Sequence, residues 1–201
     1  MLSKIICLAS LAALLAADAA AQSWKPAGSK IATEWAGKLD PANPLPEYPR
    51  PQMVRGNWLN LNGLWSYSIL PVADAAPTSA QGKILVPFAV ESSLSGVGKT
   101  VGKDSILWYE RSFSLPADFK NKKVLLQFGA VDWRCEVFVN DKPVGIHEGG
   151  YDPFSFDITA ALRAKGAQKL VVKVWDPSDD GPQPRGKQVK NPHGIWYTPV
   201  T

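Results

Sequence analysis

Apolar and polar residues alternate in short runs along most of the chain after residue 60. Large side chains take every second position, or nearly so, in residues 64–69, 106–115 and 134–140. Because successive side chains of a strand point to opposite faces, this period predicts β-strands with one buried face. Further strands are predicted at residues 83–88, 123–128, 144–147, 154–158 and 169–175. About eight short strands predict an all-β fold, a sandwich or jelly roll.

Turn-forming residues separate these runs. Residues 140–143 (NDKP) lie between two strands and predict the tight turn of a hairpin. Gly149 and Gly150 predict positive φ angles before the next strand. Residues 89–105 are rich in glycine and serine, so we expect a long loop there.

The N-terminus has the pattern of a signal peptide. Lys4 precedes an apolar run over residues 5–15, and small residues suited to cleavage follow it up to Ala21. The run is too short to span a membrane. We therefore expect residues 1–21 to be removed and the protein to be exported, to the periplasm or beyond, without a membrane anchor. A short buried helix is the alternative.

Proline dominates the next segment, residues 22–54. Proline lacks an N–H and holds its predecessor extended, so this segment predicts an extended arm in front of the β-domain. Trp24, Trp35 and Tyr48 favour an arm that docks on the domain, with a free linker as the alternative. One domain is expected over residues 55–201.

Composition narrows the function classes. The chain is 45% apolar and 10% aromatic, which excludes disorder over most of its length. The net charge of +4 comes from scattered basic residues, which gives little support for nucleic-acid binding. Cys135 is the only thiol left after the leader, so no internal disulfide is expected, and its place in an alternating run predicts a buried core residue. His147 and His193 lack neighbours of ligand type, so no metal or other cofactor is expected.

Familiar catalytic motifs are missing from the sequence. It contains no nucleophile elbow, phosphate-binding loop, zinc-binding His-Glu-x-x-His or Cys-x-x-Cys pattern. Glycoside hydrolysis needs two carboxylates, and acidic residues cluster at 152–157 and 176–180. Turn and cap roles explain the first cluster, and a solvated loop explains the second. We therefore assign no catalytic residue.

The segment over residues 176–195 carries the chemistry of sugar recognition. It combines carboxylates, amides and a guanidinium in an irregular loop, and Trp196 and Tyr197 follow directly. Sugar hydroxyls need both donors and acceptors, and aromatic rings cover the apolar faces of a sugar. Long loops on a rigid sandwich commonly bind ligands.

Two stretches resemble a known family. Residues 109–113 (YERSF) and 138–159, with the NDKPVG turn, the glycine pair and the FDIT ending, are similar to the N-terminal sugar-binding domain of family 2 glycoside hydrolases. Residues 45–51 and 62–65 resemble the entry of the same domain. The family includes β-galactosidases, β-mannosidases and β-glucuronidases.

This resemblance implies a galactose-binding-like jelly roll, followed by an immunoglobulin-like domain and a TIM barrel that carries two catalytic glutamates. It implies hydrolysis of O-glycosyl bonds of a β-glycoside by that barrel, and contacts to the sugar from two loops of the first domain. The corresponding loops are residues 91–98 and 179–188. The implied substrate-binding residues are Glu91, Asp179, Asp180, Gln183, Arg185, Lys187 and Gln188.

The resemblance also places the end of this chain before a last strand of the domain. We therefore expect an exposed strand edge and a domain that is less soluble than one extended by about fifteen residues. Two alternative functions remain open. One is a stand-alone carbohydrate-binding module, and the other is a structural sandwich that braces a partner domain around Trp133.

Overall fold

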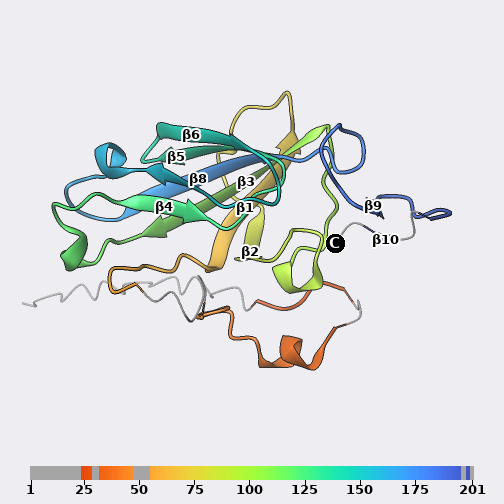
Figure 1. The fold of residues 1–201 in the computed structure, drawn as a ribbon, viewed down its shortest axis with the longest axis horizontal. Helices are drawn as coiled ribbons and strands as arrows, with labels where there is room; N and C mark the ends of the chain where they lie inside the picture. Colours follow the sequence, from red (N-terminus) through yellow and green to blue (C-terminus); the bar gives the residue numbers. More distant parts are fainter. Residues whose placement is uncertain (1–23, 29–31, 48–54, 196–197, 200–201) are drawn as a thin grey trace, which may run out of the picture.

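Six antiparallel strands form the larger layer of the molecule, in the order β2-β1-β3-β8-β5-β6 (Figure 1). The computed structural model describes residues 24–28, 32–47, 55–195 and 198–199. The strands of this sheet are β1 (Gly63–Pro71), β2 (Gly82–Val86), β3 (Ser105–Phe113), β5 (Arg134–Val139), β6 (Lys142–Glu148) and β8 (Gln168–Trp175).

A second, smaller sheet pairs β4 (Leu125–Phe128) with β7 (Phe154–Asp157), antiparallel. All eight strands that the alternation predicts are therefore present, and the all-β sandwich is confirmed. Three strand limits move inward by two residues, because β2 ends at Val86, β3 ends at Phe113 and β4 begins only at Leu125. The short parallel pair β9 (Gln188–Val189) and β10 (Thr198–Pro199) was not predicted.

Single helical turns connect some of the strands. They are the 3-10 segments η1 (Glu34–Lys38), η3 (Ser93–Ser95), η4 (Ala117–Phe119) and η5 (Thr159–Ala161). Within the described ranges, the molecule has no helix that is both long and apolar enough to cross a lipid bilayer.

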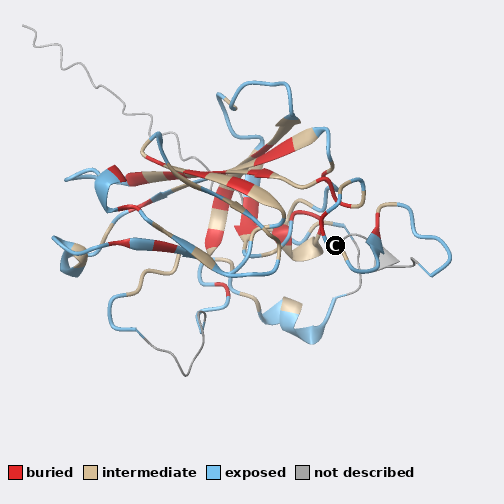
Figure 2. Cartoon of the chain, turned by 45° about the horizontal axis from the view of Figure 1, so that its top comes forward, coloured by how far each residue is buried: buried red, intermediate tan, exposed pale blue. Residues whose placement is uncertain are grey.

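The core lies on the inner face of the large sheet (Figure 2), and in β5 and β8 every second residue is buried. In β5, Cys135 and Val137 are fully buried, and Val137 is paired with Val172 of the neighbouring β8. Burial raises the pKa of the Cys135 thiol to about 11. The prediction of Cys135 as a core residue is therefore confirmed.

The hairpin between β5 and β6 turns at Asn140 and Asp141, whose φ angles are 51° and 66°. Two consecutive positive φ angles are typical of the tight turn that matches strand twist. Gly149 also has a positive φ, of 135°, as predicted. The same prediction was wrong for Gly150, which is needed for space because a Cβ there would overlap the Asp132 carboxyl group.

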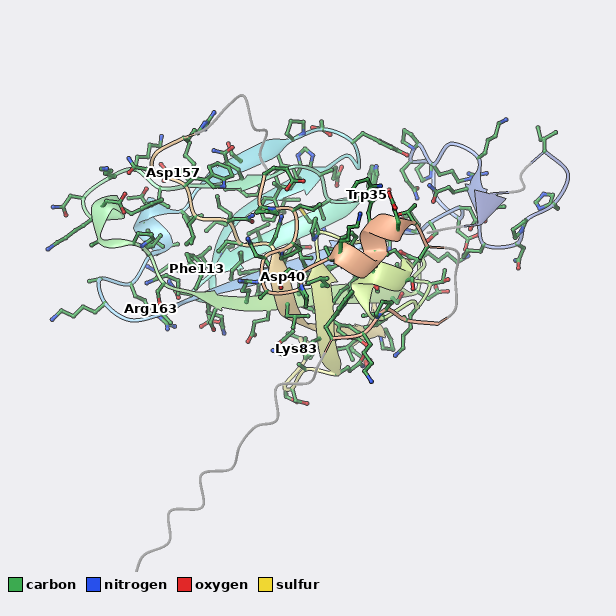
Figure 3. All side chains as sticks on the ribbon, turned by 90° about the horizontal axis from the view of Figure 1, so that it is seen from below. Trp35, Asp40, Lys83, Phe113, Asp157 and Arg163 are labelled. Carbon is green, nitrogen blue, oxygen red and sulfur yellow. The ribbon has the colours of Figure 1, made fainter. Side chains whose placement is uncertain are left out.

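The segment before the sandwich touches it at two places. Ala27 N–H donates to the Ser93 carbonyl (2.8 Å), and Trp24 Nε1 donates to the Leu94 carbonyl (3.2 Å). Pro44 is buried, and its carbonyl accepts from Asn62 Nδ2 at 3.4 Å. By contrast, η1 lies on the side of the molecule seen in Figure 3, with 64% of Trp35 exposed. The predicted leader over residues 1–21 and Tyr48 lie outside the described residues.

Candidate functional site

Three connections meet at one end of the sandwich, at the right of the sheets in Figure 1. They are residues 129–133, residues 149–153 and residues 176–187, and we call them together the loop end. Gly149 N–H donates to the Trp133 carbonyl at 3.0 Å. Tyr151 Oη donates to the Pro184 carbonyl at 3.3 Å. The fold therefore brings segments from three distant parts of the sequence to one place.

Hydrogen bonds within residues 176–183 give this loop a defined shape. Asp176 accepts from the backbone N–H of Ser178 at 2.6 Å. Gln183 is only 6% exposed, and its Nε2 donates to the Ser178 carbonyl at 2.7 Å. A buried amide bonded to its own loop supports the backbone, so the structure gives Gln183 a supporting position.

Lys190 holds the two acidic residues in the middle of the loop. Its backbone N–H donates to Asp179 at 2.9 Å, and its Nζ lies 2.6 Å from Asp180 and 3.4 Å from Asp179. Burial raises the pKa of Asp179, but the hydrogen bonds and charge of Lys190 outweigh it, so the net pKa is lowered. Asp179 is thus an ionised acceptor at neutral pH, and Asp180 is the more exposed of the two, at 39% against 16%.

Glu91 comes from the other predicted loop and is only 5% exposed. Its Oε1 accepts from the backbone N–H of Val101 at 3.3 Å. Ser178 Oγ donates to the carbonyl of the same Val101 at 2.9 Å. Val101 therefore connects Glu91 of the first predicted loop with Ser178, the residue just before the second, although Glu91 itself lies beneath the surface.

The remaining predicted residues lie farther along the loop. Arg185 is half-buried, and its carbonyl accepts from the backbone N–H of Gln188 at 3.3 Å. Lys187 and Gln188 are exposed, the latter on the short strand β9. Trp196 and Tyr197 lie outside the described residues. The role of all seven predicted residues in sugar binding stays a prediction.

The strongest electrostatic feature of the loop end was not predicted. Burial, with a contribution from the charge of Asp176, raises the pKa of Asp132 to about 6. Burial likewise raises the pKa of Asp176. Asp132 is nevertheless exposed as a residue, while its carboxyl group lies close against Gly150. Sequence pattern could offer only a weak hint, namely an acidic residue beside Trp133 at the start of a strand.

The two histidines take different positions. His147 stacks on Phe154 with ring centroids 3.9 Å apart, and its Nε2 lies 3.3 Å from Asp152. His193 is exposed, with Nδ1 2.7 Å from the Asn191 carbonyl. Among the residues that the structure describes, no three acidic, cysteine or histidine side chains are grouped so that they could hold a metal ion.

Part of the chain is similar to proteins of a known family. Residues 97–182 match the model of "Glycosyl hydrolases family 2, sugar binding domain". A β-galactosidase of Thermoanaerobacter pseudethanolicus is 38% identical over 71 residues, which is 35% of this chain and 10% of that protein. A β-glucuronidase of Formosa agariphila is 37% identical over 68 residues, which is 34% of this chain and 7% of that protein.

A solved structure, the β-glucuronidase of Lactobacillus rhamnosus, is 30% identical over 58% of this chain and 20% of its own, with a TM-score of 0.49. The chain therefore aligns with only a small part of the length of these relatives. The match to the family model covers strand β3 through to the loop that follows β8. Residues 97–182 of this protein are therefore similar to the sugar-binding domain of glycoside hydrolase family 2.

Proposed function

We propose that the loop end contacts a β-glycoside and completes one side of the substrate site of an exported family 2 glycoside hydrolase. The observation that carries this proposal is the convergence of three loops on a polar surface whose carboxylates are fixed by Lys190. Sugar recognition needs donors and acceptors held in place before the ligand arrives, because ordering them on binding costs affinity. The contacts of Lys190 supply that order.

Burial divides the predicted residues into two groups. Asp180, Lys187 and Gln188 present polar atoms at the surface, and we propose that they contact sugar hydroxyls. Asp179, Gln183 and Glu91 are largely buried and bond to the backbone, and we propose that they hold the loops in position. Arg185, half-buried, lies between these two groups.

Catalysis in this proposal belongs to other domains of the same protein. The relatives with matching segments are named β-galactosidase and β-glucuronidase, and the match spans about a tenth or less of their length. An immunoglobulin-like domain and a TIM barrel with the catalytic carboxylates are the proposed partners. The leader pattern over residues 1–21 supports export to the periplasm or beyond.

The 201-residue chain itself allows a test by NMR. Methyl β-galactoside, methyl β-mannoside and methyl β-glucuronide are titrated separately, and the backbone amide shifts of residues 176–190 are followed. We expect saturable shifts there for at least one glycoside. We expect the D180N variant to weaken that binding about tenfold, since a hydrogen bond to a charged acceptor contributes about 1.5–3 kcal/mol.

The matched control is E34Q, which removes a carboxylate charge from the exposed turn η1 and should leave the affinity unchanged. If none of the three glycosides shifts the amides of the loop end, or if D180N and E34Q bind equally well, the proposal is wrong. Loss of binding in both variants would also contradict it.

A further inference from the structure

The outer face of the large sheet carries a hollow of about 350 Å³, away from the loop end. Its floor is formed by outward residues of β1, β3, β5 and β8, and its roof by residues 76–80 of the connection between β1 and β2. We call it the outer hollow. It is of the size class of small-molecule sites and has room for a single pyranose ring.

Strand register decides which side chains face the outer hollow. Trp108 and Glu110 lie two positions apart on β3, so they share the outer face. Glu110 is paired with Val171 of β8, which is paired with Phe138 of β5. An indole, a carboxylate and a phenyl ring thus border the same hollow.

The roof is held in place by its own contacts. Ser68 Oγ donates to the Ser79 carbonyl at 3.2 Å. The Gln81 side chain donates to the Ile69 carbonyl and accepts from its N–H, at 3.0 and 3.1 Å. These bonds tie both the tip and the end of the connection to β1, so the outer hollow is formed before any ligand enters.

Two lysines around the outer hollow are paired with carboxylates, whereas Glu110 and Lys83 have no ion-pair partner among the described residues. Lys169 is paired with Asp141 at 2.5 Å, and Lys173 with Glu136 at 3.3 Å. Glu110 is exposed and makes no hydrogen bond or ion pair with any residue that the structure describes. Ser66 Oγ accepts from Lys83 Nζ at 3.0 Å, and its own hydroxyl proton remains to be donated.

We propose that the outer hollow binds one hexose unit of a glycan. The apolar face of the sugar lies against Trp108, and its hydroxyls donate to Glu110 and accept from Ser66. This combination of an aromatic ring, a carboxylate acceptor and a hydroxyl matches a sugar with hydroxyl groups on its edge and C–H groups on its face.

This second site is independent of the loop end. Asp180 lies in the loop after β8, whereas Glu110 lies on β3 beneath the connection between β1 and β2. A failure at one site therefore leaves the other intact, and the two proposals can be refuted separately.

The test uses the 201-residue chain, NMR and two neutral probes, namely methyl β-galactoside and methyl β-glucoside. We expect at least one of them to shift the amides of residues 76–80 and 106–112. The E110A variant should weaken this binding about tenfold. The D180N variant should bind at the outer hollow as the unmodified chain does.

Trp108 is tested by W108A, with W35A as the control because Trp35 is exposed on η1. W108A removes a half-buried ring, so its folding is checked by the dispersion of the amide signals. If W108A is unfolded, the affinity of E110A alone tests the proposal. No saturable shift at residues 76–80 with either neutral glycoside would overturn the proposal. So would equal affinity of E110A and the unmodified chain.

Discussion

Asn140 connects the β5–β6 hairpin to the rest of the sandwich, and its replacement should be among the most destabilising single changes at the surface. Its Nδ2 donates to the Ala161 carbonyl at 2.9 Å and to Gln168 Oε1 at 2.7 Å. Its Oδ1 accepts from the backbone N–H of Lys169 at 2.9 Å. One side chain thus joins the turn, the η5 segment and the start of the central strand β8.

The N140G variant removes these three hydrogen bonds but keeps a residue suited to the positive φ of 51°. At about 1 kcal/mol for each bond, the unfolding free energy should fall by about 2–3 kcal/mol. Gln168 Oε1 also accepts from the Arg163 N–H. Losing the bond from Asn140 to Gln168 should therefore cost the least of the three. The N140A variant adds the cost of a left-handed backbone for alanine, about 1 kcal/mol, for a total of about 3–4 kcal/mol.

Urea denaturation followed by tryptophan fluorescence measures these values. Asn121 provides a matched control, because it has a φ of 59° but its side chain makes no hydrogen bond to any residue in the described part of the chain. We expect N121G to be nearly neutral and N121A to cost about 1 kcal/mol. About 1 kcal/mol is expected for each hydrogen bond. The reasoning is refuted if the unfolding free energy of N140G lies within about 0.5 kcal/mol of that of the unmodified chain, or if N140A is as stable as N140G.

Further predictions concern pH, packing and a buried thiol. Because the pKa of Asp132 is raised to about 6, its ionisation opposes folding; D132N should therefore stabilise the protein at pH 8 and not at pH 4. After discounting for solvent screening, we expect a gain of about 1 kcal/mol, and an equal effect at both pH values would contradict it. G145A should cost about 1–3 kcal/mol because its Cβ would overlap the Phe156 ring, while G37A, with open space around it, should cost far less. Cys135 should not react with a thiol reagent in the native protein at pH 8 and should react fully in urea, since burial raises its pKa to about 11.

Strand positions could be predicted from sequence because the pleat of a sheet imposes its period on the residues. In β5, Cys135, Val137 and Val139 are fully buried, while the residues between them are only partly buried. The same alternation continues in β8. The hairpin turn was equally predictable, because few residues other than asparagine, aspartate and glycine tolerate two consecutive positive φ angles.

Features that depend on contacts between distant segments could not be predicted in this way. Gly150 looks like a residue chosen for backbone freedom, but it is required by the Asp132 carboxyl group, which lies eighteen positions earlier in the sequence. The role of Lys190 is similar, because it meets Asp179 and Asp180 only when an irregular loop closes on itself. No local pattern specifies such partners.

The chemistry of the binding loop was visible in the sequence, but the accessibility of its groups was not. Asp179 and Asp180 are identical neighbours in sequence, yet the side chain of Asp179 is 16% exposed and that of Asp180 39%. Gln183 has the same donors and acceptors as Gln188, but it is buried against the Ser178 carbonyl while Gln188 is exposed. A substitution at a buried position would therefore reduce sugar affinity and stability together. A substitution at an exposed position should reduce affinity alone, so measuring both quantities for each variant distinguishes a group that supports the loop from one that touches the ligand.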